Sequence, residues 1–243
     1  MNAKTNYYIR KTHRWLGVFI GIQFLAWTIG GLYFSWSDMD EVHGDYEKAP
    51  PVALPADAPF TYPQAALDSL RRSAQADSIA DIRLISILGK AHWQIHYFAK
   101  GHRHHKRFAL ADAQSGAFRA PLSEAEAVAV ARAGFAGKAS VQAVETLTET
   151  NGHHEYRESP LPAVAVRFDD PRATTVYVST ELGTPQKFRN QPWRRFDFLW
   201  MLHTMDFSTR DHIGNWLLRA LSILGLTTVL SGFLLFFISR KSF

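Results

Sequence analysis

The sequence contains no cysteine. This absence excludes disulfides, thiolate metal sites, iron–sulfur clusters held by cysteine and covalent c-type haem attachment. The sequence also has no nucleophile triad, HExxH motif, phosphate loop or dinucleotide fingerprint. It lacks the basic helix or aromatic platform typical of nucleic-acid binding, so we expect no nucleic-acid partner. Eleven histidines and four methionines remain as ligands for a soft metal or a haem.

Charge is missing from two long apolar runs. The first extends from Trp15 to Ser37 and the second from Ala220 to Ser239. At about 1.5 Å per residue, each run covers a hydrocarbon core about 30 Å thick. A secretory signal peptide is the competing interpretation of the first run, but that run is too long and has no small-residue cleavage site. We therefore expect two helices that span a lipid bilayer.

Basic residues stand at the outer end of each run, toward the chain termini. They are Lys4, Arg10, Lys11 and Arg14 before the first run, and Arg240 and Lys241 after the second. The positive-inside rule then predicts that both termini are cytoplasmic. The protein is thus expected in the bacterial inner membrane, with its middle segment in the periplasm. Membrane orientation also accounts for the net charge of +5 better than nucleic-acid binding does.

The middle segment contains the same pattern twice, a helix followed by antiparallel strands. The first helix is expected after Thr61 as N-cap, with Pro63 in its first turn. The second has a capping box formed by Ser123 and Glu126. In both copies a strand then enters a tight glycine turn, and in the second copy Asn151-Gly152 predicts a hairpin turn. The pattern indicates an α+β fold made of two repeats.

These patterns divide the chain into five predicted parts. They are an N-terminal transmembrane helix (1–46), a proline-rich linker (47–59), two repeats (60–120 and 121–192), and an amphipathic segment with the C-terminal transmembrane helix (193–243). Small residues on the apolar runs, such as Gly17 with Gly21 and Thr228 with Gly232, allow close helix packing. That packing can occur within one chain or in a homodimer, and both interpretations stay open.

Three segments together resemble the PepSY-associated transmembrane family. They are KTHRWLGVFIG near the N-terminus, the helix-plus-strand repeats, and LHTMDF with IGNWLL before the last helix. The resemblance covers nearly the whole chain and implies two PepSY domains. Some larger members, with four spanning helices, are haem-containing reductases of ferric siderophores. With two such helices, this chain would need a homodimer or a larger membrane complex to build the same core.

Histidines near the ends of the apolar runs are candidate axial ligands of haem b. His43, His203 and His212 are expected on the external side, where they can meet. His13 lies thirty positions before His43, about 45 Å along a helix, and so belongs to the cytoplasmic side. A haem there would need a second His13 or another protein. In one continuous helix His203 and His212 would face opposite ways, so one haem takes only one of them unless the chain breaks at 206–210.

Other residues could complete a haem site. Arg210 and Arg219 are candidate partners of the propionates, and Gly44 and Gly214 would let a flat macrocycle approach the backbone. The histidine-rich run 101–107 is a weaker candidate for metal binding and is interpreted as an exposed turn. The acidic residues after the first helix are interpreted as a solvated rim. They are Asp38, Asp40, Glu41 and Asp45.

The leading hypothesis is a haem b membrane electron-transfer protein, an oxidoreductase or a subunit of one, with ferric chelates as candidate acceptors outside. The sequence does not identify the electron donor. The alternative is a non-catalytic, membrane-anchored PepSY module that binds or regulates an envelope protein. A third hypothesis is metal delivery through His102, His104 and His105.

Overall fold

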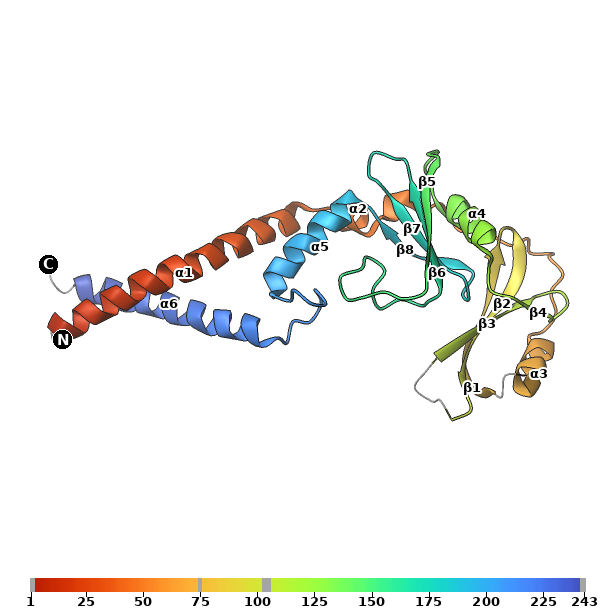
Figure 1. The fold of residues 1–243 in the computed structure, drawn as a ribbon, viewed down its shortest axis with the longest axis horizontal. Helices are drawn as coiled ribbons and strands as arrows, with labels where there is room; N and C mark the ends of the chain where they lie inside the picture. Colours follow the sequence, from red (N-terminus) through yellow and green to blue (C-terminus); the bar gives the residue numbers. More distant parts are fainter. Residues whose placement is uncertain (1–2, 74–75, 102–105, 241–243) are drawn as a thin grey trace. The chain divides into compact units, whose positions relative to one another are not determined.

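The computed structural model describes residues 3–73, 76–101 and 106–240 (Figure 1). The chain separates into two compact units. We call Met1–Asp38 together with Arg194–Phe243 the helical unit, and Met39–Trp193 the globular unit.

The helical unit contains α1 (Ala3–Trp36), α6 (Trp216–Arg240) and most of α5 (Gln191–Thr204). The stretches Lys4–Trp36 and Trp216–Ile238 are long and apolar enough to cross a membrane. Only 11% of the most apolar window of each helix is buried, whereas a core helix of a soluble protein would be mostly buried. The two predicted apolar spans are therefore present, and they are consistent with a membrane protein.

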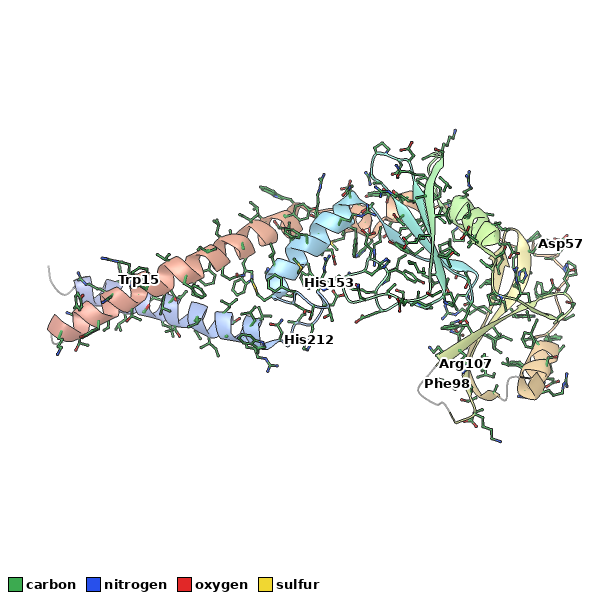
Figure 2. All side chains as sticks on the ribbon, in the orientation of Figure 1. Trp15, Asp57, Phe98, Arg107, His153 and His212 are labelled. Carbon is green, nitrogen blue, oxygen red and sulfur yellow. The ribbon has the colours of Figure 1, made fainter. Side chains whose placement is uncertain are left out.

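Helices α1 and α6 pack side by side (Figure 1). A Cβ atom at Gly225 would lie 3.0 Å from the Phe24 ring, and one at Gly232 would lie 3.2 Å from the His13 ring. The absence of a side chain at these two glycines thus lets the helices approach each other. A Cβ atom added at some other glycines would meet no atom of another part of the described chain within 4 Å: Gly17, Gly21 and Gly31. Trp15, the first residue of the first apolar run, is 67% exposed on α1 (Figure 2).

The globular unit is built from two four-stranded antiparallel sheets, each with strands in sequence order. The first contains β1 (Ala76–Ile87), β2 (Lys90–Ala99), β3 (Lys106–Asp112) and β4 (Phe118–Arg119). The second contains β5 (Val141–Leu147), β6 (Ala163–Phe168), β7 (Thr175–Ser179) and β8 (Thr184–Arg189). Helix α3 (Gln64–Ser73) precedes the first sheet and α4 (Glu124–Gly134) the second. A short helix α2 (Met39–His43) and a 3-10 turn η1 (Asp45–Glu47) come before both.

This arrangement confirms the predicted α+β fold with two copies of a helix and an antiparallel sheet. The corresponding glycine turns are also present, because Gly116 and Gly183 both have a positive φ, 73° and 70°, between the last two strands of each sheet. Helix α3 buries Leu70 against Ile95 of the first sheet. Helix α4 lies in a larger core that includes Phe168 of the second sheet and residues of the first.

Thr61 does not cap α3 as predicted. Its hydroxyl and its amide both bond to the carbonyl of Ala113, and the carbonyl of Pro63 accepts the first helical bond from Leu67. The reason is long-range, since the first sheet supplies an acceptor that a local cap signal does not reveal.

Asn151-Gly152 does not form a two-residue hairpin. Strands β5 and β6 do pair, but the pairing begins at Leu147 with Ala163, so residues 148–162 form a long loop. Tyr156 holds this loop to the core: it is fully buried, stacks on Tyr177 and donates from its hydroxyl to the carbonyl of Pro160. Burial of a large aromatic side chain thus overrides the local turn signal.

The predicted capping box of α4 is present. Ser123 Oγ accepts from the amide of Glu126, and the Glu126 carboxylate accepts from the Ser123 amide at 2.9 Å. A guanidinium N–H of Arg119 donates to the same carboxylate at 2.8 Å. The bond from the Ser123 amide and then the one from Arg119 lower the pKa of Glu126 to about 2.

We expect Ser123→Ala to lower the free energy of unfolding by about 1 kcal/mol, because an amide of the first turn loses its acceptor.

The Glu126 charge also contributes to the free energy of unfolding. This contribution is fully present above the carboxyl's unfolded pKa near 4.5 and is lost as pH falls through its folded pKa of about 2. The stability gap between wild type and Glu126→Gln should therefore close over that pH range. Denaturant unfolding, with Ser140→Ala as an exposed control, tests both. Equal losses in the two serine variants would contradict the cap.

Candidate functional site

The helical unit contains a cavity of about 330 Å³ where α1, α5 and α6 meet. Its lining is mostly aromatic and aliphatic: Trp27, Trp200, His203, Thr204, Ile213, Leu218 and Ser222. Ligand sites in proteins typically enclose about 300–1,000 Å³ and combine apolar walls with a few polar groups. The cavity has this character, and every residue that lines it belongs to the helical unit.

His203, in the last turn of α5, is the histidine of this cavity. Its ring is surrounded by three aromatic rings, with centroids 6.0 Å away for Trp27 and 5.9 Å away for both Phe34 and Trp200. The Trp200 ring is nearly parallel to the imidazole, at 12°. The Trp27 indole N–H also donates to the His203 carbonyl at 3.1 Å. Two helices therefore hold the position of this histidine.

One nitrogen of the His203 ring has no partner. Nδ1 is buried and makes no hydrogen bond within the described part of the chain. A buried polar atom left unsatisfied costs about 1–3 kcal/mol, so such atoms are rare unless something else binds them. Imidazole nitrogen is a common ligand of haem iron and of other metals. Among the predicted histidines, His203 is the one whose surroundings favour a cofactor.

The chain breaks between the two helices that carry His203 and His212. Helix α5 ends at Thr204 and α6 begins at Trp216. The turn between them is organised by the Asp206 carboxylate, which accepts from the amides of Ser208, Thr209 and His212 and from two hydroxyls. Burial of Asp206 opposes its ionisation, but these bonds outweigh burial and hold its pKa below the ordinary value. The break required for both histidines to serve one site is therefore present.

His212 lies on this loop and is exposed (Figure 2). A Cβ atom at Gly214 would be 3.2 Å from His212 Nε2 and 3.7 Å from Arg219 Nη2, so these two side chains gather beside this glycine. Neither of them is among the residues that line the cavity. His212 and Arg219 thus lie near one another on the loop side of the helical unit.

Arg210 already has a protein partner. Its Nη1 donates to the buried carboxylate of Asp197 on α5. Its Nε is buried and has no acceptor among the residues that the structure describes. The Arg210 guanidinium therefore helps to join the loop to α5 through Nη1.

Neither His43 nor His13 is among the residues that line the cavity. His43 ends α2 in the globular unit and is exposed. The prediction that Gly44 leaves room for a macrocycle is wrong, because a Cβ atom there would be 2.9 Å from Cβ of Phe188. His13 is half-buried in the N-terminal half of α1, where its Nδ1 lies 2.7 Å from Ser231 Oγ. His13 thus contributes to packing between α1 and α6.

The aromatic residues around His203 and the cap of α6 were not predicted from the sequence. Trp27 and Phe34 are seven positions apart, and Trp200 is three before His203, spacings that place each pair on one helical face. Asn215 caps α6 by accepting from the Leu218 amide at 2.8 Å, and its side-chain amide donates to the carbonyl of Thr204. An asparagine immediately before an apolar run is a recognisable N-cap signal.

No group of three or more potential metal ligands occurs within the described ranges. The histidine cluster His102, His104 and His105 lies outside those ranges, so the metal-delivery hypothesis stays a prediction. Comparison of the chain with protein-family models, with curated proteins and with solved structures finds no match. The resemblance to the PepSY-associated family therefore also stays a prediction.

Proposed function

We propose that this chain is a haem b membrane electron-transfer protein, an oxidoreductase or a subunit of one, whose cofactor site is the cavity beside His203. One observation carries the proposal. His203 lines an aromatic cavity of the unit that contains both apolar helices, and its buried Nδ1 has no hydrogen-bond partner among the described residues. An apolar pocket with an inward-facing histidine between helices is the environment that a b-type haem requires.

The residues of the cavity have distinct roles in this proposal. His203 would hold the iron, and Trp27, Phe34 and Trp200 orient its ring and exclude water from it. When bound, haem b supplies one-electron transfer. A second axial ligand would come from His212, which belongs to the same unit. His43, which the sequence pairs with His203 or His212, stays a prediction. His13 would hold a further haem only together with a second copy or another protein.

Two arginines would bind the propionates. Arg219 is the stronger candidate, because it is exposed beside His212 and no acid in the described ranges forms an ion pair with it. Arg210 is the weaker candidate, because the Asp197 carboxylate already binds its Nη1. A guanidinium suits this task because its donors match carboxylate geometry.

The proposal also covers the orientation of the chain in the membrane and its electron-transfer partners. The basic residues at the outer ends of the apolar runs favour cytoplasmic termini in a bacterial inner membrane, with the globular unit in the periplasm. Electrons would pass from a membrane or cytoplasmic donor to an external acceptor such as a ferric chelate. A homodimer or larger complex would supply the helices that two spans lack. The repeated helix and four-stranded sheet support assignment of the globular unit as two PepSY domains.

The direct test is an absorption spectrum of the full-length protein. The protein would be purified in mild detergent from haem-replete cells and measured before and after dithionite. We expect a Soret band that sharpens on reduction and an α-band typical of bis-histidine haem b. Conversion of the bound haem to its pyridine complex would give the number of haems per chain. A flat visible spectrum from a folded preparation would rule the proposal out.

A second candidate function is a membrane-anchored module that binds another envelope protein without catalysis. It is favoured by an apolar cleft in the globular unit, to which no residue of the helical unit contributes. A protein that is folded and free of haem, yet binds peptide through this cleft, would support this candidate over the first.

A further inference from the structure

The globular unit contains an apolar cleft of about 510 Å³. One wall is formed by Leu84, Ile85 and Ser86 of β1, and another by α4 and β8 with Val130 and Phe188. Strand β1 is an edge of the first sheet and β8 is an edge of the second. The cleft therefore lies between two sheet edges, whose outer backbone groups have no neighbouring strand among the residues that the structure describes.

The hairpin register shows which backbone groups of β1 face outward. Strands β1 and β2 join through Leu88 and Gly89, both with positive φ (49° and 82°), and Ile87 pairs with Lys90. In such a two-residue turn the flanking residues exchange both of their backbone hydrogen bonds. Because the pattern alternates, the amides and carbonyls of Leu84 and Ser86 point away from β2.

An independent contact supports this register. Ala91 is the residue opposite Ser86, and its carbonyl accepts from the Ala113 amide at 3.0 Å, on the side away from β1. Ala91 therefore directs its backbone away from Ser86, as expected for a pair that is not hydrogen-bonded. The backbone groups of Ser86 consequently face the free edge.

Ser86 also has a side-chain group without a partner. Its hydroxyl is buried and has no hydrogen-bond partner in the described part of the chain. The cleft thus combines apolar walls with a row of polar groups along one edge. An acyl chain could fill the apolar space, but it would leave these polar groups unsatisfied.

We propose that this cleft binds an extended apolar peptide segment of another protein, which adds as a strand to the free edge of β1. Only a polypeptide offers donors and acceptors at the spacing of alternate strand residues, about 6.6–6.8 Å. The space is sufficient for side chains, since a cavity of about 150 Å³ already holds a benzene ring. The proposal uses no residue of the helical unit and does not depend on haem binding.

The test uses the full-length chain in lipid nanodiscs, with empty nanodiscs as a blank. The probe is a pool of nine-residue peptides with Val, Ile, Leu or Phe at alternate positions and Thr between them. Hydrogen exchange measured by mass spectrometry should slow in the segment of β1 that contains Leu84 and Ser86. Strand β5, the other edge of the second sheet, serves as the control for non-specific adhesion.

Two variants separate strand addition from simple apolar binding. Ser86→Pro removes the outward amide while keeping the bonds from β1 to β2, and proline is tolerated on edge strands in this way. We expect it to weaken peptide binding by about tenfold or more. Ser86→Ala keeps the amide and should weaken binding by only a few-fold. Ala133→Trp, at an exposed position of α4 that lines the cleft, should block binding by filling the space.

Several outcomes would overturn the proposal. They are no peptide binding from the pool, binding without slower exchange in β1, and equal affinity of Ser86→Pro and wild type. Binding of decanoate in the cleft, blocked by Ala133→Trp and unaffected by the peptides, would assign the site to an acyl chain instead. Unchanged exchange in β2 of each variant would show that it folds.

Discussion

Replacement of His203 by alanine should remove haem from the purified protein. His203 is the predicted ligand that lines the cavity, and its buried Nδ1 has no hydrogen-bond partner among the described residues. Loss of an outer-shell partner of a metal ligand already costs roughly 10–100-fold in affinity, and loss of the ligand itself should cost more. The Soret absorbance per chain should therefore fall to the background of a control membrane protein.

Two comparisons make this result specific. His212→Ala and His43→Ala should identify the second ligand, because only its loss converts a low-spin spectrum to a high-spin one. His154→Ala, which changes a histidine of the globular unit, should leave the spectrum as it is. Haem added together with imidazole to His203→Ala should restore part of the low-spin spectrum. Haem content equal to wild type in His203→Ala would remove His203 from the site.

Replacement of Asn190 by leucine should lower the free energy of unfolding of the globular unit by about 3–5 kcal/mol. Asn190 is fully buried. Its side-chain amide donates to the carbonyl of Glu41 at 2.7 Å and to the carboxylate of Glu47 at 3.2 Å, and its oxygen accepts from the Trp193 amide. Leucine fills a similar volume but satisfies none of these groups, and it leaves a buried carboxylate without one of its donors.

The Glu47 carboxylate explains why Asn190→Leu should cause a large loss in the free energy of unfolding. Glu47 is 6% exposed and pairs with Arg172 at 2.8 Å. Denaturant unfolding followed by tryptophan fluorescence would measure the loss, with Asn151→Leu as the control at an exposed turn. A loss below about 1 kcal/mol for Asn190→Leu would mean that solvent reaches this network and replaces the missing bonds.

The local parts of the fold could be predicted from the sequence. The charge-free runs predicted both long apolar helices, because length and hydropathy are properties of consecutive residues. The capping box at Ser123 and the glycine turns at Gly116 and Gly183 were predicted for the same reason, since their partners lie a few positions away. The repeated order of helix and strands then indicated two antiparallel sheets.

The groups that meet at the candidate sites depend on residues that lie far apart along the chain. The sequence predicted that three histidines lie on the external side, but only the packing of α1 against α5 distinguishes His203, because Trp27 bonds to its carbonyl from 176 positions away. Glu47 was assigned to a linker, whereas Arg172 and Asn190, 125 and 143 positions away, bind its buried carboxylate. Spacing along the chain shows which neighbours share a helical face or a turn. It carries no signal for pairs that meet only when separate elements pack, so tertiary structure alone decided these contacts.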